Sequence, residues 1–374
     1  MLPTPRPPLR STLIPAQGIC FFLGSVATIS IPSDATNDII HTTQGKFLQE
    51  NLVFLKPVIM VIRMTIEKFQ ETILSWYAKN RRDLPWRHTK DPYKILVSEI
   101  MLQQTQVSRV LAKYKEFLKA FPTLETLSKA PDKKLLKVWQ GLGYWRRAKY
   151  LKETAKILVG AQKTNFGNRG VRARRSPPWA GGGGKRFPKI RFSEPRELEE
   201  LPGIGHYTAR AVACFAFGSC EAFLDTNIRR IYLHFFFQGR TDVPDSEILK
   251  IAQKATTNLR ICKKSKYRGI TPREWHYALF DYGAIVLKDK AINKRSRHYA
   301  KQSKFEGSFR SFRTQAVKFL LSASRNKTTH NALEKYIQEL LNQKTSSYSY
   351  SYASIIDSLL KDGLLKKSPT HYFL

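Results

Sequence analysis

The chain has 374 residues, and 42% of them are hydrophobic, which is enough apolar material for a substantial core in two to three folding units. Its 64 lysines and arginines outweigh 29 aspartates and glutamates and give a formal net charge of +35. This composition excludes a disordered chain and favours a polyanionic partner, with nucleic acid as the first candidate. A solvated basic surface or a ribosome-associated protein would show the same charge, so the chemistry must come from motifs.

The four cysteines, Cys20, Cys214, Cys220 and Cys262, are too few and too irregularly spaced for a disulfide framework or a CxxC metal site, which favours a reducing compartment. The most apolar N-terminal run, Gly18–Ile31, falls short of the ~20 residues that a spanning helix needs, and no clear small-residue cleavage site marks it as a signal peptide. We therefore expect no membrane segment and a cytoplasmic, nucleoid-associated location.

In chain order, residues 1–63 are rich in Pro, Ser and Thr and predict a poorly ordered N-terminal extension. From residue 64 onward the apolar spacing is helical and no convincing strand series appears, which predicts an all-α catalytic domain over residues 64–305. The predicted helices begin with Ile66–Tyr77 and continue with Tyr93–Tyr114, Leu124–Lys129, Lys133–Trp139, Arg146–Leu158, Glu194–Leu201, Tyr207–Phe217, Thr226–Phe237 and Glu274–Tyr282.

Two further segments stand apart from this domain. Residues 162–192 carry nine Lys/Arg, no Asp or Glu, and four consecutive glycines, which predicts a basic Gly/Pro-rich insertion at a surface connection. Residues 308–374 show helical patterns at Phe312–Ser322, Leu333–Leu341 and Ala353–Leu360, followed by a terminal hairpin pattern. This order resembles a small winged-helix-like domain, which would either touch DNA or pack against the body.

A series of short motifs runs through the predicted catalytic domain. They are Leu84–Arg87, Asp91–Tyr93, Ser98–Val107, Gly141–Tyr144, Leu201–Gly205, Leu224–Asn227 and Gly283–Ala284. In this order they resemble the catalytic domain of adenine DNA glycosylases of the MutY type, in the helix-hairpin-helix/endonuclease III superfamily, over roughly residues 66–285. The resemblance implies a two-lobed, all-α helix-hairpin-helix fold with the winged-helix-like domain appended.

The resemblance implies that Glu99 and Asp225 are the catalytic carboxylates. On one continuous helix, Glu99, Gln103 and Gln106 would share a stripe, and a desolvated Glu99 would have a raised pKa that suits it to protonate adenine N7. Asp225 precedes a helical run, so it is a candidate N-cap as well as a charge that stabilises an oxocarbenium-like sugar, with Asn227 holding it.

Leu201–Gly205 resembles the hairpin of a helix-hairpin-helix, in which Gly203 and Gly205 would let backbone N–H groups approach a phosphate. Related enzymes with lyase activity carry a lysine at the position of Tyr207. The tyrosine implies a monofunctional glycosylase, with Tyr207 orienting Asp225 or the sugar, and Thr208 joins the predicted DNA-binding residues.

Removal of a base from duplex DNA requires the nucleotide to leave the stack, and other groups must fill the gap. Gln103, Gln104 and Tyr144 match the family residues that do this, whereas Trp86 and Arg87 resemble residues of the adenine pocket. For Tyr144 and Trp86, core packing is a competing role.

The chain departs from the family pattern after Gly283–Ala284. Residues Ile285–Lys304 contain none of the four cysteines that hold a [4Fe-4S] cluster in most members, so no cofactor or metal is expected. Seven Lys/Arg occupy Lys288–Lys304 instead and predict direct phosphate contact. The C-terminal segment also looks short for the Nudix-like domain that reads 8-oxoguanine, which leaves open whether guanine or its oxidised form is the opposite base.

The predicted activity is hydrolysis of the N-glycosidic bond of adenine mispaired with guanine or 8-oxoguanine, by a monomer acting on double-stranded DNA in base excision repair. Related thymine glycosylases acting on T·G or U·G also carry the hairpin tyrosine, but Gln103-Gln104 favours the adenine enzymes. A non-catalytic mismatch-binding protein would be expected to lack one carboxylate, and both Glu99 and Asp225 are present.

Overall fold

The computed structural model describes residues 18–23, 27–32, 64–166, 191–261, 269–343 and 350–374. The chain divides into two compact units, Met1–Arg63 and Met64–Leu374. In the first unit, β1 (Gly18–Leu23) pairs antiparallel with β2 (Ala27–Pro32), with Cys20 opposite Ser30. Ile, Phe and Thr in these two segments favour extended strands. The remainder of the expected extension lies outside the described residues.

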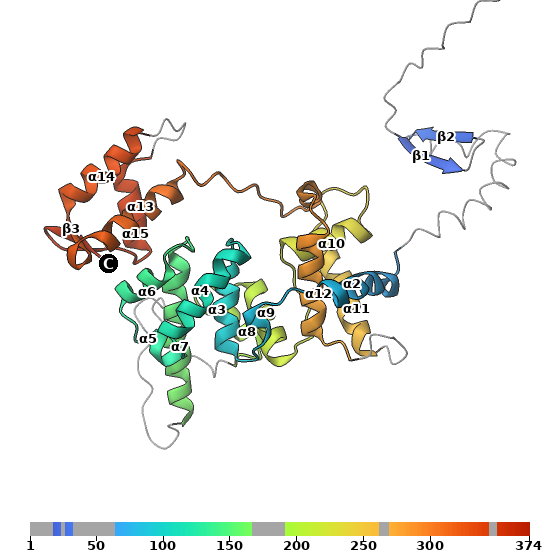
Figure 1. Ribbon diagram of the computed structural model, residues 1–374, viewed down its shortest axis with the longest axis horizontal. Coiled ribbons are helices and arrows are strands. Elements are labelled where there is room, and N and C mark those ends of the chain that lie inside the picture. The colour runs from blue at the N-terminus through green and yellow to red at the C-terminus, as the bar shows by residue number, and fades with distance from the viewer. Residues whose placement is uncertain (1–17, 24–26, 33–63, 167–190, 262–268, 344–349) are drawn as a thin grey trace, which may run out of the picture. The chain divides into compact units, whose positions relative to one another are not determined.

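The second unit is mostly helical, and its part up to residue 305 has two lobes (Figure 1). The first lobe contains α3 (Pro92–Leu102), α4 (Val107–Ala120), α5 (Leu124–Ser128), α6 (Asp132–Trp139), α7 (Arg146–Phe166), α8 (Pro195–Glu199) and α9 (His206–Phe217). The second contains α2 (Ile66–Asn80), α10 (Thr226–Phe236), α11 (Asp245–Ile261) and α12 (Pro272–Ile285). Within the second unit, the chain therefore begins in the second lobe, forms the first lobe and returns to the second.

Aromatic packing holds the second lobe together. Phe69 of α2 is fully buried, with its ring 5.2 Å from Tyr232 of α10 and 5.6 Å from Trp275 of α12. Gly283 lets α12 approach α10, because a Cβ at this position would lie 2.9 Å from the backbone oxygen of Asn227. The lobe thus fixes the start of α10, where the Leu224–Asn227 motif lies.

The predicted helix Tyr93–Tyr114 is wrong in one respect, because the chain breaks between α3 and α4. Gln103 caps α3, Gln104 has a φ of 54°, and Gln106 is the N-cap of α4. Glu99, Gln103 and Gln106 therefore do not share a helical stripe.

A buried arginine, Arg147 of α7, stabilises this break. Its guanidinium donates hydrogen bonds at both ends of the break, to the carbonyls of Ile100, Met101, Gln103, Leu142 and Gly143 and to Thr105 Oγ1. The last carbonyls of a helix lack intrahelical partners, and here one side chain supplies them. Two loops distant in sequence are thereby held together.

Most other helices lie within a few residues of their predicted ranges, but α11 was missed, and α7 runs to Phe166, into the range expected to be insertion. Residues 167–190 of that insertion lie outside the described part of the chain. Two 3-10 helices, η1 (Pro85–Arg87) and η2 (Lys290–Arg295), complete the two-lobed part.

The C-terminal part contains three helices and a small sheet, as the winged-helix-like prediction requires. α13 (Phe309–Ser322), η3 (Ser324–Asn326), α14 (His330–Gln343) and α15 (Tyr352–Lys361) accompany β3 (Lys327–Thr329), β4 (Lys366–Lys367) and β5 (His371–Phe373). The strands are antiparallel in the order β3-β5-β4, with Tyr372 opposite both Thr328 and Lys367. No helix in the described ranges is long and apolar enough to cross a membrane.

Candidate active site

The first carboxylate of the site, Glu99, lies in the middle of α3. Asp91 caps this helix by accepting from the Tyr93 N–H, and Pro92 occupies its first position. From Ile95 to Met101 every residue is buried, so the helix is surrounded by protein and Glu99 is only 4% exposed. A carboxylate in this position is costly unless it takes up a proton.

Tyr207 of α9 donates its hydroxyl proton to Glu99 Oε2 across 3.0 Å. Desolvation raises the pKa of Glu99 from 4.5 to about 7, an effect that the Tyr207 hydrogen bond opposes and the charge of Asp225 reinforces. Burial also raises the pKa of Tyr207 well above 10. Tyr207 thus contacts Glu99, which differs from the expectation that it orients Asp225 or the sugar.

The second carboxylate, Asp225, is the N-cap of α10. Its Oδ1 accepts from the Ile228 N–H at 2.7 Å, and its Oδ2 accepts from Asn227 Nδ2 at 2.9 Å. Burial raises the pKa of Asp225, while the hydrogen bonds from Ile228 and Asn227 act in the opposite direction. Asn227 therefore holds Asp225, as its place in the motif predicts.

A chain of hydrogen bonds fixes Asn227 in turn. Its side-chain oxygen accepts from Arg230 at 2.8 Å, and the same arginine nitrogen donates to the Gly283 carbonyl. Gly283 packs directly against Asn227, so the Gly283–Ala284 motif supports the site from behind. Sequence reasoning missed Arg230, although its place three residues after Asn227 on one helical face was a usable signal.

Gln103 and Thr208 form a link between two motifs. Gln103 Nε2 donates to Thr208 Oγ1 at 3.1 Å, which joins the end of α3 to the first turn of α9. Thr208 is only 2% exposed. In the free protein Thr208 therefore holds Gln103, and its DNA contact stays a prediction.

Gln104 and Tyr144 sit at the tips of the two loops that Arg147 holds. Both have left-handed backbones, with φ of 54° and 47°, a conformation that costs energy in non-glycine residues. Gln302 donates to the side-chain oxygens of both residues, and Arg310 of α13 also donates to the Tyr144 hydroxyl. Tyr144 is partly exposed, so it is not a simple core residue.

The two glycines of the hairpin have different surroundings. Gly203 has a φ of 75°, and a Cβ added there would lie 2.9 Å from the Tyr150 side chain. Gly205 is the N-cap of α9, and a Cβ there would meet no atom within 4 Å. The open backbone expected near a phosphate is therefore found at Gly205, whereas Gly203 serves a tight turn against an aromatic ring.

Trp86 and Arg87 lie in the interior. Trp86 is 4% exposed and packs edge to face on Tyr114 at 5.5 Å. Arg87 forms a bidentate pair with the buried Asp281, at 2.8 and 2.7 Å, and stacks over Tyr277. The geometry favours packing for Trp86, and it ties Arg87 to Asp281, from where its charge still lowers the pKa of Glu99.

The basic segment after α12 is partly engaged with the protein itself. Arg295 donates to the carbonyls of Leu233 and Phe237 at the end of α10, and the exposed Arg297 pairs with Asp242 at 2.7 Å. In the free protein these two side chains therefore already have partners, and their phosphate contacts stay a prediction. The segment has no cysteine, so its donor set does not fit a four-thiolate cluster.

Part of the chain matches known DNA repair proteins. Residues 97–257 match the HhH-GPD superfamily base excision DNA repair protein family. Adenine DNA glycosylase of Buchnera aphidicola (subsp. Baizongia pistaciae) is 36% identical over 228 residues, which are 60% of this chain and 54% of that protein. The Mycobacterium tuberculosis adenine DNA glycosylase is 38% identical over 171 residues, which are 46% and 48% of the two chains.

A third relative is matched over more of its length. The thymine/uracil-DNA glycosylase of Methanothermobacter thermautotrophicus is 31% identical over 219 residues, which are 58% of this chain and 84% of that protein. The chain spans only about half the length of the adenine enzymes that it matches. It belongs to the HhH-GPD superfamily of base excision DNA repair proteins.

Proposed function

We propose that this protein is a monofunctional DNA glycosylase that hydrolyses the N-glycosidic bond of adenine mispaired with guanine or 8-oxoguanine. The observation that carries the proposal is the buried Glu99, whose pKa of about 7 leaves a large protonated fraction at neutral pH. Adenine has a basic N7, and protonation there makes the base a better leaving group. Thymine and uracil offer no such nitrogen, so a carboxylic acid in this position favours a purine.

Asp225 supplies the complementary charge. The N–H donors of Ile228 and Asn227 hold its carboxylate at a fixed position. A fixed negative charge near the anomeric carbon stabilises the oxocarbenium-like cation that develops as the base departs. Water then completes the hydrolysis.

Tyr207 supports hydrolysis over lyase chemistry. Strand cleavage through a Schiff base requires an amine, and the side chain that reaches Glu99 from α9 is a phenol with a pKa raised well above 10. Base removal is therefore expected to leave an intact abasic strand.

A thymine or uracil glycosylase is the second candidate, because the archaeal thymine/uracil enzyme is matched over 84% of its length. An assay over duplexes with A·8-oxoguanine, A·G, T·G and U·G pairs separates the two. We expect adenine release from the first two pairs, strand breakage only after alkali, and no covalent product with borohydride. Release confined to T·G and U·G would instead assign the second function.

The lack of cluster cysteines adds a cofactor expectation to the proposal. Purified active protein should contain no stoichiometric iron and should keep its activity with a chelator present. Iron in a fixed ratio to active protein would contradict this.

A further inference from the structure

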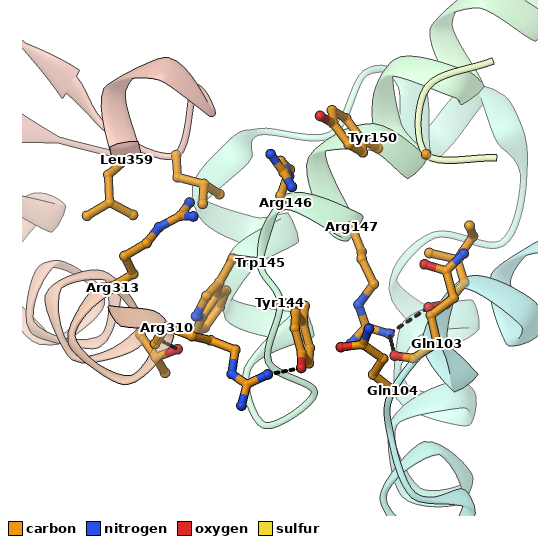
Figure 2. Close-up of a pocket in the computed structure, with 14 residues that line it drawn as sticks. Gln103, Gln104, Tyr144, Trp145, Arg146, Arg147, Tyr150, Arg310, Arg313 and Leu359 are labelled. Carbon is orange, nitrogen blue, oxygen red and sulfur yellow. Dashed lines mark hydrogen bonds between the residues drawn. The ribbon is translucent and has the colours of Figure 1, made fainter. Parts of the chain in front are cut away.

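A cavity of about 300 Å³ lies between the glycosylase part and the C-terminal helices, both within the second unit (Figure 2). Its lining comes from the end of α3, the 141–145 loop, α7, the hairpin, α13 and α15. The lining residues include four arginines (Arg146, Arg147, Arg310 and Arg313), three aromatic residues (Tyr144, Trp145 and Tyr150) and two glutamines (Gln103 and Gln104), and no acidic residue. Arg146 and Gln104 are exposed and leave the cavity open to solvent.

Four buried hydrogen-bond donors of the lining residues have no acceptor among the described residues. They are Trp145 Nε1, Arg147 Nε, Arg310 Nε and Arg313 Nε. A buried donor without a partner costs about 1–3 kcal/mol, so this lining has more donors than the protein's own acceptors satisfy.

The charges around the cavity favour an anionic ligand. Asp362 at the end of α15 is shared by Arg146, at 3.2 Å, and Arg313. Arg310 forms no ion pair with any described residue, since its partners are the Tyr144 hydroxyl and the Ser303 carbonyl. Two guanidinium groups thus share one carboxylate, and Arg310 has no acidic partner among the described residues. Guanidinium binds phosphate well because its forked donors match phosphate oxygens.

The aromatic residues add a second kind of contact. The Tyr144 ring lies between two guanidiniums, with Arg310 4.9 Å and Arg147 5.3 Å from its centroid. Rings beside arginines suit a nucleoside joined to its phosphate, because bases stack on both.

We propose that this cavity binds a nucleotide through its phosphate, and that α13 thereby makes the C-terminal part of the molecule a component of the DNA-binding surface. The inference rests on the proposed binding of DNA and needs no base removal. The phosphate could belong to a DNA strand or to a free mononucleotide, and these two sources give different results in one experiment.

The test compares Arg310→Gln with Lys318→Gln in the full chain. Lys318 lies on the same helix, is exposed, and does not line the cavity, so it controls for loss of one positive charge. Affinity for a labelled mispaired duplex is measured over a range of salt concentrations. The slope of log affinity against log salt is negative. We expect Arg310→Gln to reduce the magnitude of this slope by about 0.9, and Lys318→Gln to leave the slope unchanged. Equal slopes in both variants, or no change in either, would overturn the proposal.

Asp362→Asn gives a result of opposite sign, because it frees Arg146 and Arg313 from their carboxylate. We expect tighter duplex binding, and unchanged or weaker binding by a variant that melts like the wild type would contradict the proposal. If Asp362→Asn melts below the assay temperature, the Arg310 and Lys318 comparison decides alone.

Competition by dAMP distinguishes the two sources. No competition at millimolar dAMP, together with the altered slope, assigns the cavity to a DNA strand. Competition that Arg310→Gln abolishes assigns it to a free nucleotide. Single-turnover base release by the same preparations is a separate measurement, so salt-dependent duplex binding without release would refute the proposed function and leave the cavity assignment intact.

Discussion

The surroundings of Glu99 and Asp225 differ although both side chains are carboxylates of one site. Glu99 lies in the middle of a buried helix, where Tyr207 donates a hydrogen bond to it and desolvation raises its pKa to about 7. Asp225 lies at a helix start, where two N–H groups donate to its oxygens and limit the rise of its pKa. The helix N-terminus also favours a negative charge.

This difference shows how one chemical group takes two roles. A mid-helix position supplies no spare backbone N–H, so Glu99 tends to keep its proton and suits an acid. An N-cap position supplies free N–H groups, which stabilise the ionised form of Asp225 against the effect of burial and suit it to the role of a charge stabiliser. The four predictions below test this contrast, from the largest expected effect to the smallest.

Glu99→Gln should lower single-turnover adenine release by about 10²–10⁴-fold at pH 7, because glutamine has the shape of the acid but delivers no proton. Duplex affinity should stay close to that of the wild type. Glu116→Gln is a matched control, since it makes the same change at an exposed position of α4. A rate near that of the wild type would remove Glu99 from the chemistry.

Asp225→Asn should lower the same rate by about 10²–10³-fold, because it removes the charge that faces the developing cation. Asparagine can still accept from the Ile228 N–H, so the melting temperature should change little. Asp289→Asn, at the N-cap of η2, controls for loss of a capping carboxylate. An unaltered rate would leave Asp225 as a cap alone.

Asn227→Ala should have a smaller effect, a loss of about tenfold, since it removes one of the two N–H donors to Asp225. The pKa of Asp225 should rise, because the lost hydrogen bond stabilised its ionised form. The acidic limb of the pH–rate profile should therefore move to higher pH. A uniform loss without movement of that limb would indicate a structural role only.

Tyr207→Phe should change the rate at pH 7 the least, by about twofold, but should alter its pH dependence. The Tyr207 hydrogen bond lowers the pKa of Glu99, so its removal should raise that pKa above about 7. Glu99 would then stay protonated at higher pH, and the alkaline limb should move upward between pH 7 and 9. Movement in the opposite direction would contradict the contact seen in the structure.

The sequence predicts the fold well wherever a helix has one apolar face. The all-α class, the two lobes and the three C-terminal helices follow from such periodicity and from the motif resemblance. Helix α11, which the sequence analysis missed, also has one apolar face, with Ile248, Ala252 and Ala255 buried on it. Asp245 and Glu247 lie in its first turn, as is typical of a helix start.

The break after α3 could not be found in this way. Residues 103–106 contain no proline or glycine, and the side chain that bonds to the carbonyls at the break is Arg147, more than forty residues away in the sequence. The adjacent Arg146 is exposed, so composition alone does not show which arginine is buried.

In the candidate site, too, local features could be predicted from the sequence and contacts between distant residues could not. Glu99, Asp225 and Asn227 come from motifs, because their positions within local elements fix their surroundings. The partners across the fold do not follow, as the contacts Tyr207–Glu99, Gln103–Thr208 and Arg310–Tyr144 show. Each joins residues separated by more than a hundred positions, and a local pattern carries no information on such pairs.

The burial of Glu99 links the folding of the chain to proton uptake. The unfolded residue titrates near 4.5 and the folded one near 7, so the folded state binds a proton over this interval that the unfolded state releases. The stability that this proton contributes is complete below about pH 4.5, and about 3 kcal/mol of it is lost as the pH rises through 7. The proton therefore acts as a ligand that binds the native state more tightly than the unfolded state. A lower pH favours the protonated Glu99 that the proposed chemistry requires.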